Sequence, residues 1–235
     1  MSRRSFVIGG AAVGAAAIGG IGVVTAQDLH ATRRALHDHG IVEGPNLTQP
    51  RVDTVTVDYR TEPGPRGDVN YGLYRPPNGV TAVVYCLHGR GGNRHDAFDS
   101  IGLHRFIAAR GLPWAVASLD GRESYWHGRA DGSDTQQDLL DVLVPIAETS
   151  TTPLKRAVIG WSMGGYGALL LGETQPDFFA AVVASAPALW TSFGATAPGA
   201  FDNSADFKAN DVMGGASRLV PSATRVDCGA DDPFA

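Results

Sequence analysis

The chain has 235 residues, of which 43% are hydrophobic and 18% are charged, and its formal net charge is −5. This composition provides enough apolar side chains for the core of one domain and excludes a largely disordered chain. The absence of any marked run of Lys or Arg argues against nucleic acid as a partner. Two cysteines are too few for a disulfide framework, and no Cys or His spacing typical of a metal site occurs, so the sequence predicts neither a metal nor another cofactor.

The N-terminus has the pattern of an export signal over residues 1–26. Arg3 and Arg4 precede an uncharged stretch, residues 5–27, that is rich in Ala, Gly, Val and Ile. This is the arrangement of a twin-arginine signal. A permanent membrane anchor is the alternative, because the stretch approaches the length of a membrane span, although Gly and Ala make it only mildly apolar. Either interpretation places the folded part outside the cytoplasm, extracellular or in the cell envelope, and limits membrane contact to this segment.

After a polar lead-in over residues 27–50, the chain alternates between predicted strands and predicted helices. Apolar–polar alternation and short apolar runs predict strands, and apolar side chains at helical spacing predict helices. Strands are predicted over residues 52–59, 69–74, 81–87, 114–119, 155–160, 180–185 and 224–228. Helices are predicted over residues 96–110, from Ser133 or Asp134 to about 148, and over 163–173, with 186–215 largely irregular.

This order of elements predicts the fold class. Two early strands followed by strand–helix alternation indicate an α/β domain with a mostly parallel sheet and helices on both faces. The predicted domain covers residues 51–235. No internal repeat is present beside it.

One motif indicates nucleophilic chemistry. Gly160-Trp161-Ser162-Met163-Gly164 lies between a predicted strand and a predicted helix. In this context Gly-x-Ser-x-Gly forms a turn so sharp that its flanking positions must be nearly free of side chains. The turn lifts the serine hydroxyl above the carboxyl edge of the sheet, at a helix N-terminus that favours negative charge. Ser162 is therefore the candidate nucleophile, and a glycine-rich helix start with an ordinary capping serine is the alternative.

A second glycine-rich segment, His-Gly-Arg-Gly-Gly at residues 88–92, follows a predicted buried strand. In hydrolases with the serine turn, this loop donates one backbone N–H to the oxyanion, and the residue after the nucleophile donates the other. We assign these donors to Arg90 and Met163. A phosphate-binding loop is the alternative, but the segment lacks the Lys-Ser/Thr ending of a P-loop. His88 is a conceivable base, and a structural role for its ring nitrogens is the favoured interpretation.

The segment after the last predicted strand contains the candidate acid of a catalytic triad. In this class of hydrolase the acid follows the serine along the chain and precedes the histidine. Asp232, three residues after Gly229, is the first choice, and Asp231 is held in reserve. The alternative is a solvated turn, because Asp-Asp-Pro is common in turns.

The stretch Gly-Trp-Ser-Met-Gly-Gly-Tyr-Gly-Ala at residues 160–168 resembles the esterase D family of the α/β-hydrolases, the group that includes the mycobacterial mycolyltransferase antigens. Residues 87–92 and 227–234 support the resemblance, which covers roughly residues 52–235. The resemblance implies the α/β-hydrolase fold and the same nucleophile, oxyanion donors and acid as the motifs. It also implies a loop near the acyl site that contains Tyr125, Trp126 and His127. The tryptophans are expected mostly in the core, and Trp126 has the best claim among them to face the substrate.

The sequence departs from this family at one catalytic position. The family's catalytic histidine follows the acid, whereas none of the seven histidines of this chain follows Ser162. The last strand and the closing helix expected of the fold are also missing. We therefore interpret the chain as a C-terminally truncated member of the family. The alternative is that His127 or His88 replaces the missing base.

These observations predict an exported carboxylic-ester hydrolase that acts on a small-molecule or lipid ester through an acyl-enzyme on Ser162. Because no histidine follows the acid, we expect the chain to be weak or inactive. One alternative is an acyltransferase of the mycolyl type with a sugar acceptor. Another is a non-catalytic, exported binding protein built on a degenerate hydrolase fold.

Overall fold

The computed structural model describes residues 48–52, 55–149, 154–220 and 223–229. The predicted export signal and most of the lead-in lie outside the described residues. The candidate acids Asp231 and Asp232 lie outside them as well. The following description concerns the body that begins at Gln49.

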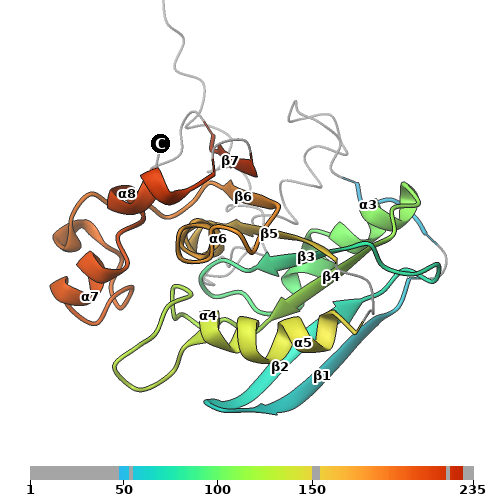
Figure 1. The fold of residues 1–235 in the computed structure, drawn as a ribbon, viewed down its shortest axis with the longest axis horizontal. Coiled ribbons are helices and arrows are strands. Elements are labelled where there is room, and N and C mark those ends of the chain that lie inside the picture. Colours follow the sequence, from blue (N-terminus) through green and yellow to red (C-terminus); the bar gives the residue numbers. More distant parts are fainter. Residues whose placement is uncertain (1–47, 53–54, 150–153, 221–222, 230–235) are drawn as a thin grey trace, which may run out of the picture. The chain divides into compact units, whose positions relative to one another are not determined.

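The described residues form a seven-stranded sheet in the order β1-β2-β4-β3-β5-β6-β7 (Figure 1). Strands β1 and β2 form an antiparallel hairpin, β2 also pairs antiparallel with β4, and the other four pairs are parallel. The bounds are β1 Val57–Gly64, β2 Gly67–Tyr74, β3 Ala82–Leu87, β4 Trp114–Leu119, β5 Lys155–Trp161, β6 Ala181–Ser185 and β7 Thr224–Asp227.

Strands β3 and β4 correspond to the short apolar runs in the sequence, and their place inside the sheet explains this composition. Strands β3 and β4 are covered on both faces, so polar side chains have no face to occupy. In β3, Val83, Tyr85 and Leu87 pack into one core, and Val84 and Cys86 pack into the other. This alternation is the two-residue period of a strand.

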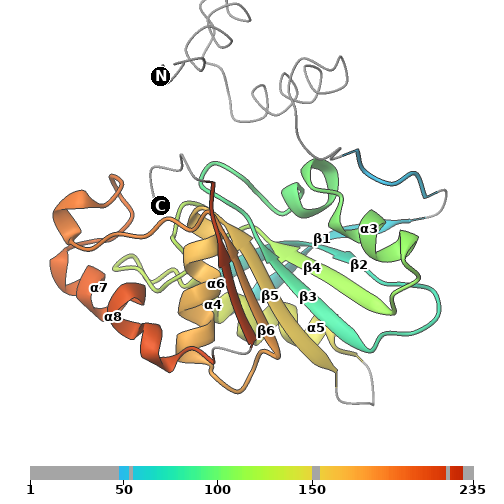
Figure 2. The ribbon, with the colours of Figure 1, turned by 90° about the horizontal axis from the view of Figure 1, so that it is seen from above.

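Helices cover both faces of the sheet (Figure 2). The segment α4–α5 and α6 pack into the larger core, and the π-helical turn before α3 packs with α3 into the smaller one. No helix among the described residues combines the length and the apolar character needed to cross a membrane. The bounds are a π-helical turn Asp96–Ser100, α3 Leu103–Ala109, α4 Thr135–Asp138, a π-helical turn Leu139–Leu143, α5 Val144–Ala147, α6 Met163–Thr174, a 3-10 turn Phe193–Ala195, α7 Ser204–Ala209, α8 Val212–Gly215 and a 3-10 turn Ala216–Arg218.

The predicted strands are confirmed in number and order, and the predicted helices are present, with three differences. The helix predicted over residues 96–110 is divided into a π-helical turn and α3, because Gly102 between them has a left-handed φ of 70°. The first strand starts at Val57 and continues to Gly64, because its pairing with β2 extends to the hairpin turn, where Gly67 has a φ of 108°. The segment expected to be irregular holds both α7 and α8. The Asn203 side chain caps α7 by accepting hydrogen bonds from two backbone N–H groups. A helix of six residues is too short to show a helical spacing of apolar side chains in the sequence.

A buried carboxyl group joins α6 to the segment that follows α8. The Glu173 side chain is fully buried, and its Oε2 accepts a hydrogen bond from Nη2 of Arg218 at 2.8 Å. Its Oε1 has no hydrogen-bond partner among the described atoms. Burial raises the pKa of Glu173 from 4.5 to about 7, although the Arg218 guanidinium opposes the shift. The folded chain therefore retains a proton that the unfolded chain releases at lower pH.

We predict that Glu173→Gln changes the pH dependence of stability. Because native protein binds more protons than unfolded protein between pH 4.5 and 7, this group makes the wild-type free energy of unfolding fall as the pH rises through that window. The fall amounts to at most about 3 kcal/mol, at about 1.4 kcal/mol per pKa unit. Glu173→Gln lacks this contribution, so its free energy of unfolding does not fall in this way. In denaturant titrations the free energy of unfolding of Glu173→Gln minus that of the wild type should therefore increase from pH 4.5 to pH 8. Exposed Glu123→Gln is the control, and parallel curves for Glu173→Gln and the wild type would contradict the prediction.

Candidate active site

Ser162 occupies the turn between β5 and α6, at the carboxyl edge of the parallel strands. Its backbone has φ 53° and ψ −120°, a conformation that is rare for a residue with a Cβ. Three hydrogen bonds hold it there: its N–H donates to Ser185 O at 3.1 Å, and its carbonyl accepts from Tyr166 N and Ala188 N at 3.0 Å each. Strain of this kind persists only where the surroundings impose it, and it is concentrated at functional sites.

The glycines of the turn are required by close backbone packing. A Cβ on Gly160 would collide with the backbone of Gly164. A Cβ on Gly164 would collide with the carbonyl of Leu87 and would lie 2.7 Å from the carbonyl oxygen of His88. The first turn of α6 therefore rests directly on the end of β3, where the glycine-rich loop begins.

Both assigned oxyanion donors are available in this arrangement. Met163 is the first residue of α6, so its backbone N–H has no intrahelical acceptor. The N–H of Arg90 makes no hydrogen bond to another described residue, while the loop around it is closed by Gly92 N donating to Gly89 O at 3.0 Å. A Cβ on Gly89 would lie 3.1 Å from the Trp161 indole, so the loop passes directly over the turn that holds the serine.

Neither histidine considered as a substitute base is exposed. His88 is fully buried; its Nδ1 donates to Gly89 O at 2.8 Å, and its Nε2 accepts from Gly121 N at 2.8 Å, so both ring nitrogens are engaged. Burial lowers the pKa of His88, consistent with a neutral ring. The ring of His127 is also buried, with Nδ1 3.0 Å from Gly128 O and 3.6 Å from Asp206 Oδ1, and Nε2 3.1 Å from Ala200 O. Because a carbonyl oxygen only accepts, a neutral His127 ring donates to one of the two carbonyls. Burial denies both rings the access that a base needs.

Trp126 lies in the core, as expected by default for the tryptophans, and the alternative that it faces the substrate is wrong. Trp126 is 0% exposed, and its flanking residues Tyr125 and His127 are 3% and 2% exposed. The indole fills the space that Gly121 and Gly167 leave open, since a Cβ on either glycine would collide with it. These two glycines lie on separate segments of the chain, so no local pattern in the sequence signals this burial.

Sequence analysis did not single out Asp227 or Ser185, which support the serine turn. At the end of β7, Oδ1 of Asp227 accepts from Ser185 Oγ at 2.9 Å, and its backbone carbonyl accepts from Ala186 N at 2.6 Å. Ser185 in turn accepts the Ser162 N–H. Both residues stand at the carboxyl ends of neighbouring parallel strands, and this position was the available signal.

Aromatic side chains from three segments gather beside the turn. Tyr166, one helical turn after Ser162, packs edge-to-face against Tyr125 and Phe201, and Trp190 packs against the same two rings, with centroids 5.5–6.1 Å apart. A cavity of only about 10 Å³ lies between Tyr166, Trp190 and the helices α7 and α8. The segment after β6 thus covers the larger core beside the serine.

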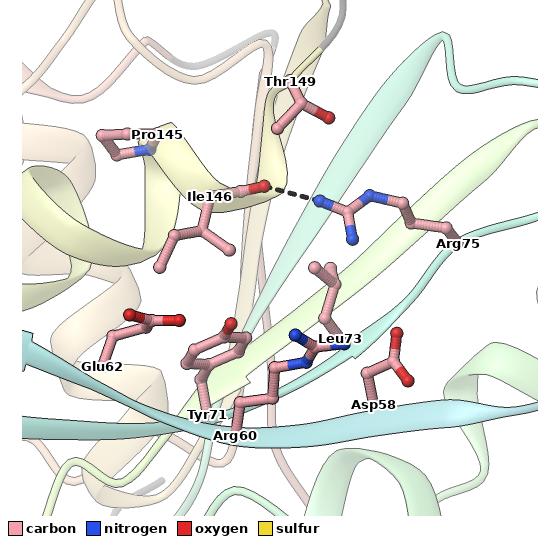
Figure 3. A pocket seen from close by; sticks show the side chains of 9 residues that line it. All are labelled: Asp58, Arg60, Glu62, Tyr71, Leu73, Arg75, Pro145, Ile146 and Thr149. Carbon is pink, nitrogen blue, oxygen red and sulfur yellow. Dashed lines mark hydrogen bonds between the residues drawn. The ribbon is translucent and has the colours of Figure 1, made fainter.

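A larger cavity of about 490 Å³ lies away from this site (Figure 3). It is lined by the β1–β2 hairpin and the end of α5, at the opposite end of the strand order from β7. Arg75 crosses it to donate to the carbonyl of Ile146, and Arg60 and Tyr71 face the same space. None of its lining residues is a serine, cysteine or histidine, so size alone does not identify the active site.

The comparisons with known proteins agree with this geometry. A model of the Esterase family matches residues 67–231, about 70% of the chain. The chain belongs to this family. Family membership identifies it as a carboxylic-ester hydrolase and confirms the expected esterase group of α/β-hydrolases. Within the described residues, no group of three or more His, Cys, Asp or Glu side chains is placed to hold a metal ion.

Solved structures confirm the α/β-hydrolase fold. The fluorophosphonate-binding serine hydrolase FphF of Staphylococcus aureus is 18% identical with a TM-score of 0.61, covering 74% of this chain and 79% of its own. A ferulic acid esterase is 19% identical with a TM-score of 0.60, covering 75% and 80%. MPT51 (FbpC1) of Mycobacterium tuberculosis is 21% identical with a TM-score of 0.57, covering 77% and 78%. At these identities the likeness is evidence for the fold alone.

We predict that Gly164→Ala destabilises the chain by about 2–3 kcal/mol or more, because the new methyl group meets backbone carbonyls that cannot move aside as a side chain would. Gly194→Ala is the matched control, since a Cβ there meets nothing within 4 Å. Its effect is expected to stay within about 0.5 kcal/mol. Denaturant unfolding measures both variants, and equal stabilities would show that α6 does not press on the end of β3.

Proposed function

We propose that the chain is an exported serine ester hydrolase in which Ser162 forms an acyl-enzyme with a small-molecule or lipid ester. The observation that carries this proposal is the combination of a strained serine turn with two unengaged backbone donors, Arg90 N–H and Met163 N–H. Export rests on the twin-arginine pattern of residues 1–26. Asp232 is proposed as the acid, with Asp231 in reserve.

The reaction follows from where charge develops. The Ser162 hydroxyl attacks the ester carbonyl, and the carbonyl oxygen becomes an oxyanion between the two N–H donors. Each donor contributes on the order of 3 kcal/mol when it is fixed in advance, because it stabilises the transition state more than the bound ester. The serine proton passes to the departing alkoxide, which leaves as the alcohol, and water then attacks the acyl-serine ester, releasing the carboxylic acid and regenerating the serine hydroxyl.

In this scheme the rate depends on how readily a base removes the proton of the serine hydroxyl. His88 and His127 are both buried, His88 has both ring nitrogens engaged, and no histidine follows Ser162. An unassisted serine hydroxyl is a poor nucleophile at neutral pH. Loss of a member of a catalytic triad costs about 10⁴- to 10⁶-fold in turnover. The 235-residue chain is therefore expected to hydrolyse esters slowly.

The cavity of about 10 Å³ between Tyr166, Trp190 and the α7–α8 segment is not lined by Ser162, Arg90 or Met163, so it does not measure the space for an acyl group. We choose p-nitrophenyl acetate as the first substrate to test, because its activated ester and small acyl group place few demands on a pocket.

We predict slow hydrolysis of p-nitrophenyl acetate that Ser162→Ala abolishes and that exposed Ser192→Ala leaves unchanged. Added imidazole is expected to increase the hydrolysis rate of the wild type more than that of Ser162→Ala. Ser162 is only half-buried, so the added base can take the proton of its hydroxyl. A fluorophosphonate probe measures the same reactivity without turnover.

Two results would contradict the proposal in different ways. Rapid turnover that depends on Ser162 without imidazole would show that the chain contains an efficient base. Equal rates and equal probe labelling for wild type and Ser162→Ala, with and without imidazole, would remove Ser162 as the nucleophile and favour a non-catalytic binding protein.

A further inference from the structure

We propose that Trp126 is a positioning residue that fixes the spacing of the two oxyanion donors. The inference rests on the proposed function, because it concerns the loop that carries Arg90 N–H and the helix that carries Met163 N–H. These two groups come from separate segments of the chain, so some contact must set the distance between them. Trp126, on a third segment, contacts both.

The first contact is with the glycine-rich loop. Trp126 Nε1 donates a hydrogen bond to the carbonyl oxygen of His88 at 3.3 Å, and its ring packs on the His88 ring with centroids 5.3 Å apart. His88 is also tied to the Trp126 segment by the bond from Gly121 N to its Nε2. The peptide groups that follow His88 lead directly to the Arg90 N–H.

The second contact is with α6. A Cβ on Gly167 would lie 2.5 Å from Cβ and Cγ of Trp126, so the indole rests against the backbone of the second turn of the helix. A Cβ on Gly164 would lie 2.7 Å from the same His88 carbonyl oxygen that accepts the indole hydrogen bond. One carbonyl thus meets both Trp126 and the helix turn that begins with Met163.

The backbone of the Trp126 segment is held in an unfavourable conformation. Arg122, Tyr125 and Trp126 have φ values of 51°, 54° and 57°. Non-glycine residues with positive φ persist only where other contacts impose them. Ser124 supplies one such contact, because its Oγ accepts from Trp126 N at 3.0 Å and pairs with Thr135 Oγ1 at 2.6 Å. An ordinary loop would not need this constraint, whereas a positioning element does.

The test removes the indole N–H by two routes. Trp126→Phe deletes the donor and part of the ring, and site-specific replacement of Trp126 by benzothienylalanine deletes only the donor and keeps the shape. Trp114→Phe, at a 38% exposed tryptophan at the start of β4, is the matched control. Denaturant unfolding monitors global stability, and amide hydrogen exchange of residues 86–92 reports the loop. Labelling by a fluorophosphonate probe reports the donors, since its phosphoryl oxygen occupies the oxyanion position.

We expect both replacements at Trp126 to increase amide exchange in residues 86–92 by about tenfold, with no change for Trp114→Phe. Global stability should stay unchanged in the benzothienylalanine variant, which keeps the ring shape, whereas Trp126→Phe also leaves a cavity and loses stability. The maximal labelling rate should fall by about tenfold, while the probe concentration for half-maximal rate stays constant, because oxyanion donors act on the transition state and not on initial binding. A simple packing role would lower global stability without this separation.

Unchanged loop exchange and labelling in the benzothienylalanine variant would overturn the proposal, whatever the stability of Trp126→Phe. If the wild type is not labelled at all, the proposed serine chemistry fails, and the exchange data still decide the role of Trp126. Faster exchange would then support a positioning contact in an inactive site, and unchanged exchange would refute it.

Discussion

The contact between the first turn of α6 and the end of β3 is the constraint on which the site depends. Gly164 lies so close to the carbonyls of Leu87 and His88 that no side chain fits between them. This approach brings a helix N-terminus, with its unpaired N–H groups, beside the loop that leaves the neighbouring strand. The strained backbone of Ser162 follows from it, because the chain must turn from β5 into α6 within one residue.

The sheet supports that contact from both sides. Strands β3 and β5 pair in parallel from Ala82 to Leu87, so their carboxyl ends, and the segments that leave them, meet at one edge. Strands β6 and β7 continue the edge, and Ser185 and Asp227 fasten it to the backbone of Ser162. The backbone of Ser162 is therefore fixed by main-chain hydrogen bonds, one with β6, one with α6 and one with the segment after β6.

Buried polar groups have structural tasks in this molecule. His88 and His127 looked like candidate bases in the sequence, yet each places both ring nitrogens against backbone groups. A buried polar ring without partners would cost about 1–3 kcal/mol, so these contacts are what permit the rings to be buried. Trp126 belongs to the same unit, and its burial explains glycines at two distant positions, Gly121 and Gly167.

The sequence by itself determined the order of strands and helices, the class of fold and the serine turn. These features are local, because a period of two, a helical spacing or a glycine-flanked serine is visible within a few residues. Only the tertiary structure decided what each side chain touches. Trp126 is buried because glycines some five residues before it and 41 residues after it leave room, and His127 is engaged because Ala200, 73 residues away, offers its carbonyl. Such contacts depend on how separate segments pack, and no pattern within one segment reveals them.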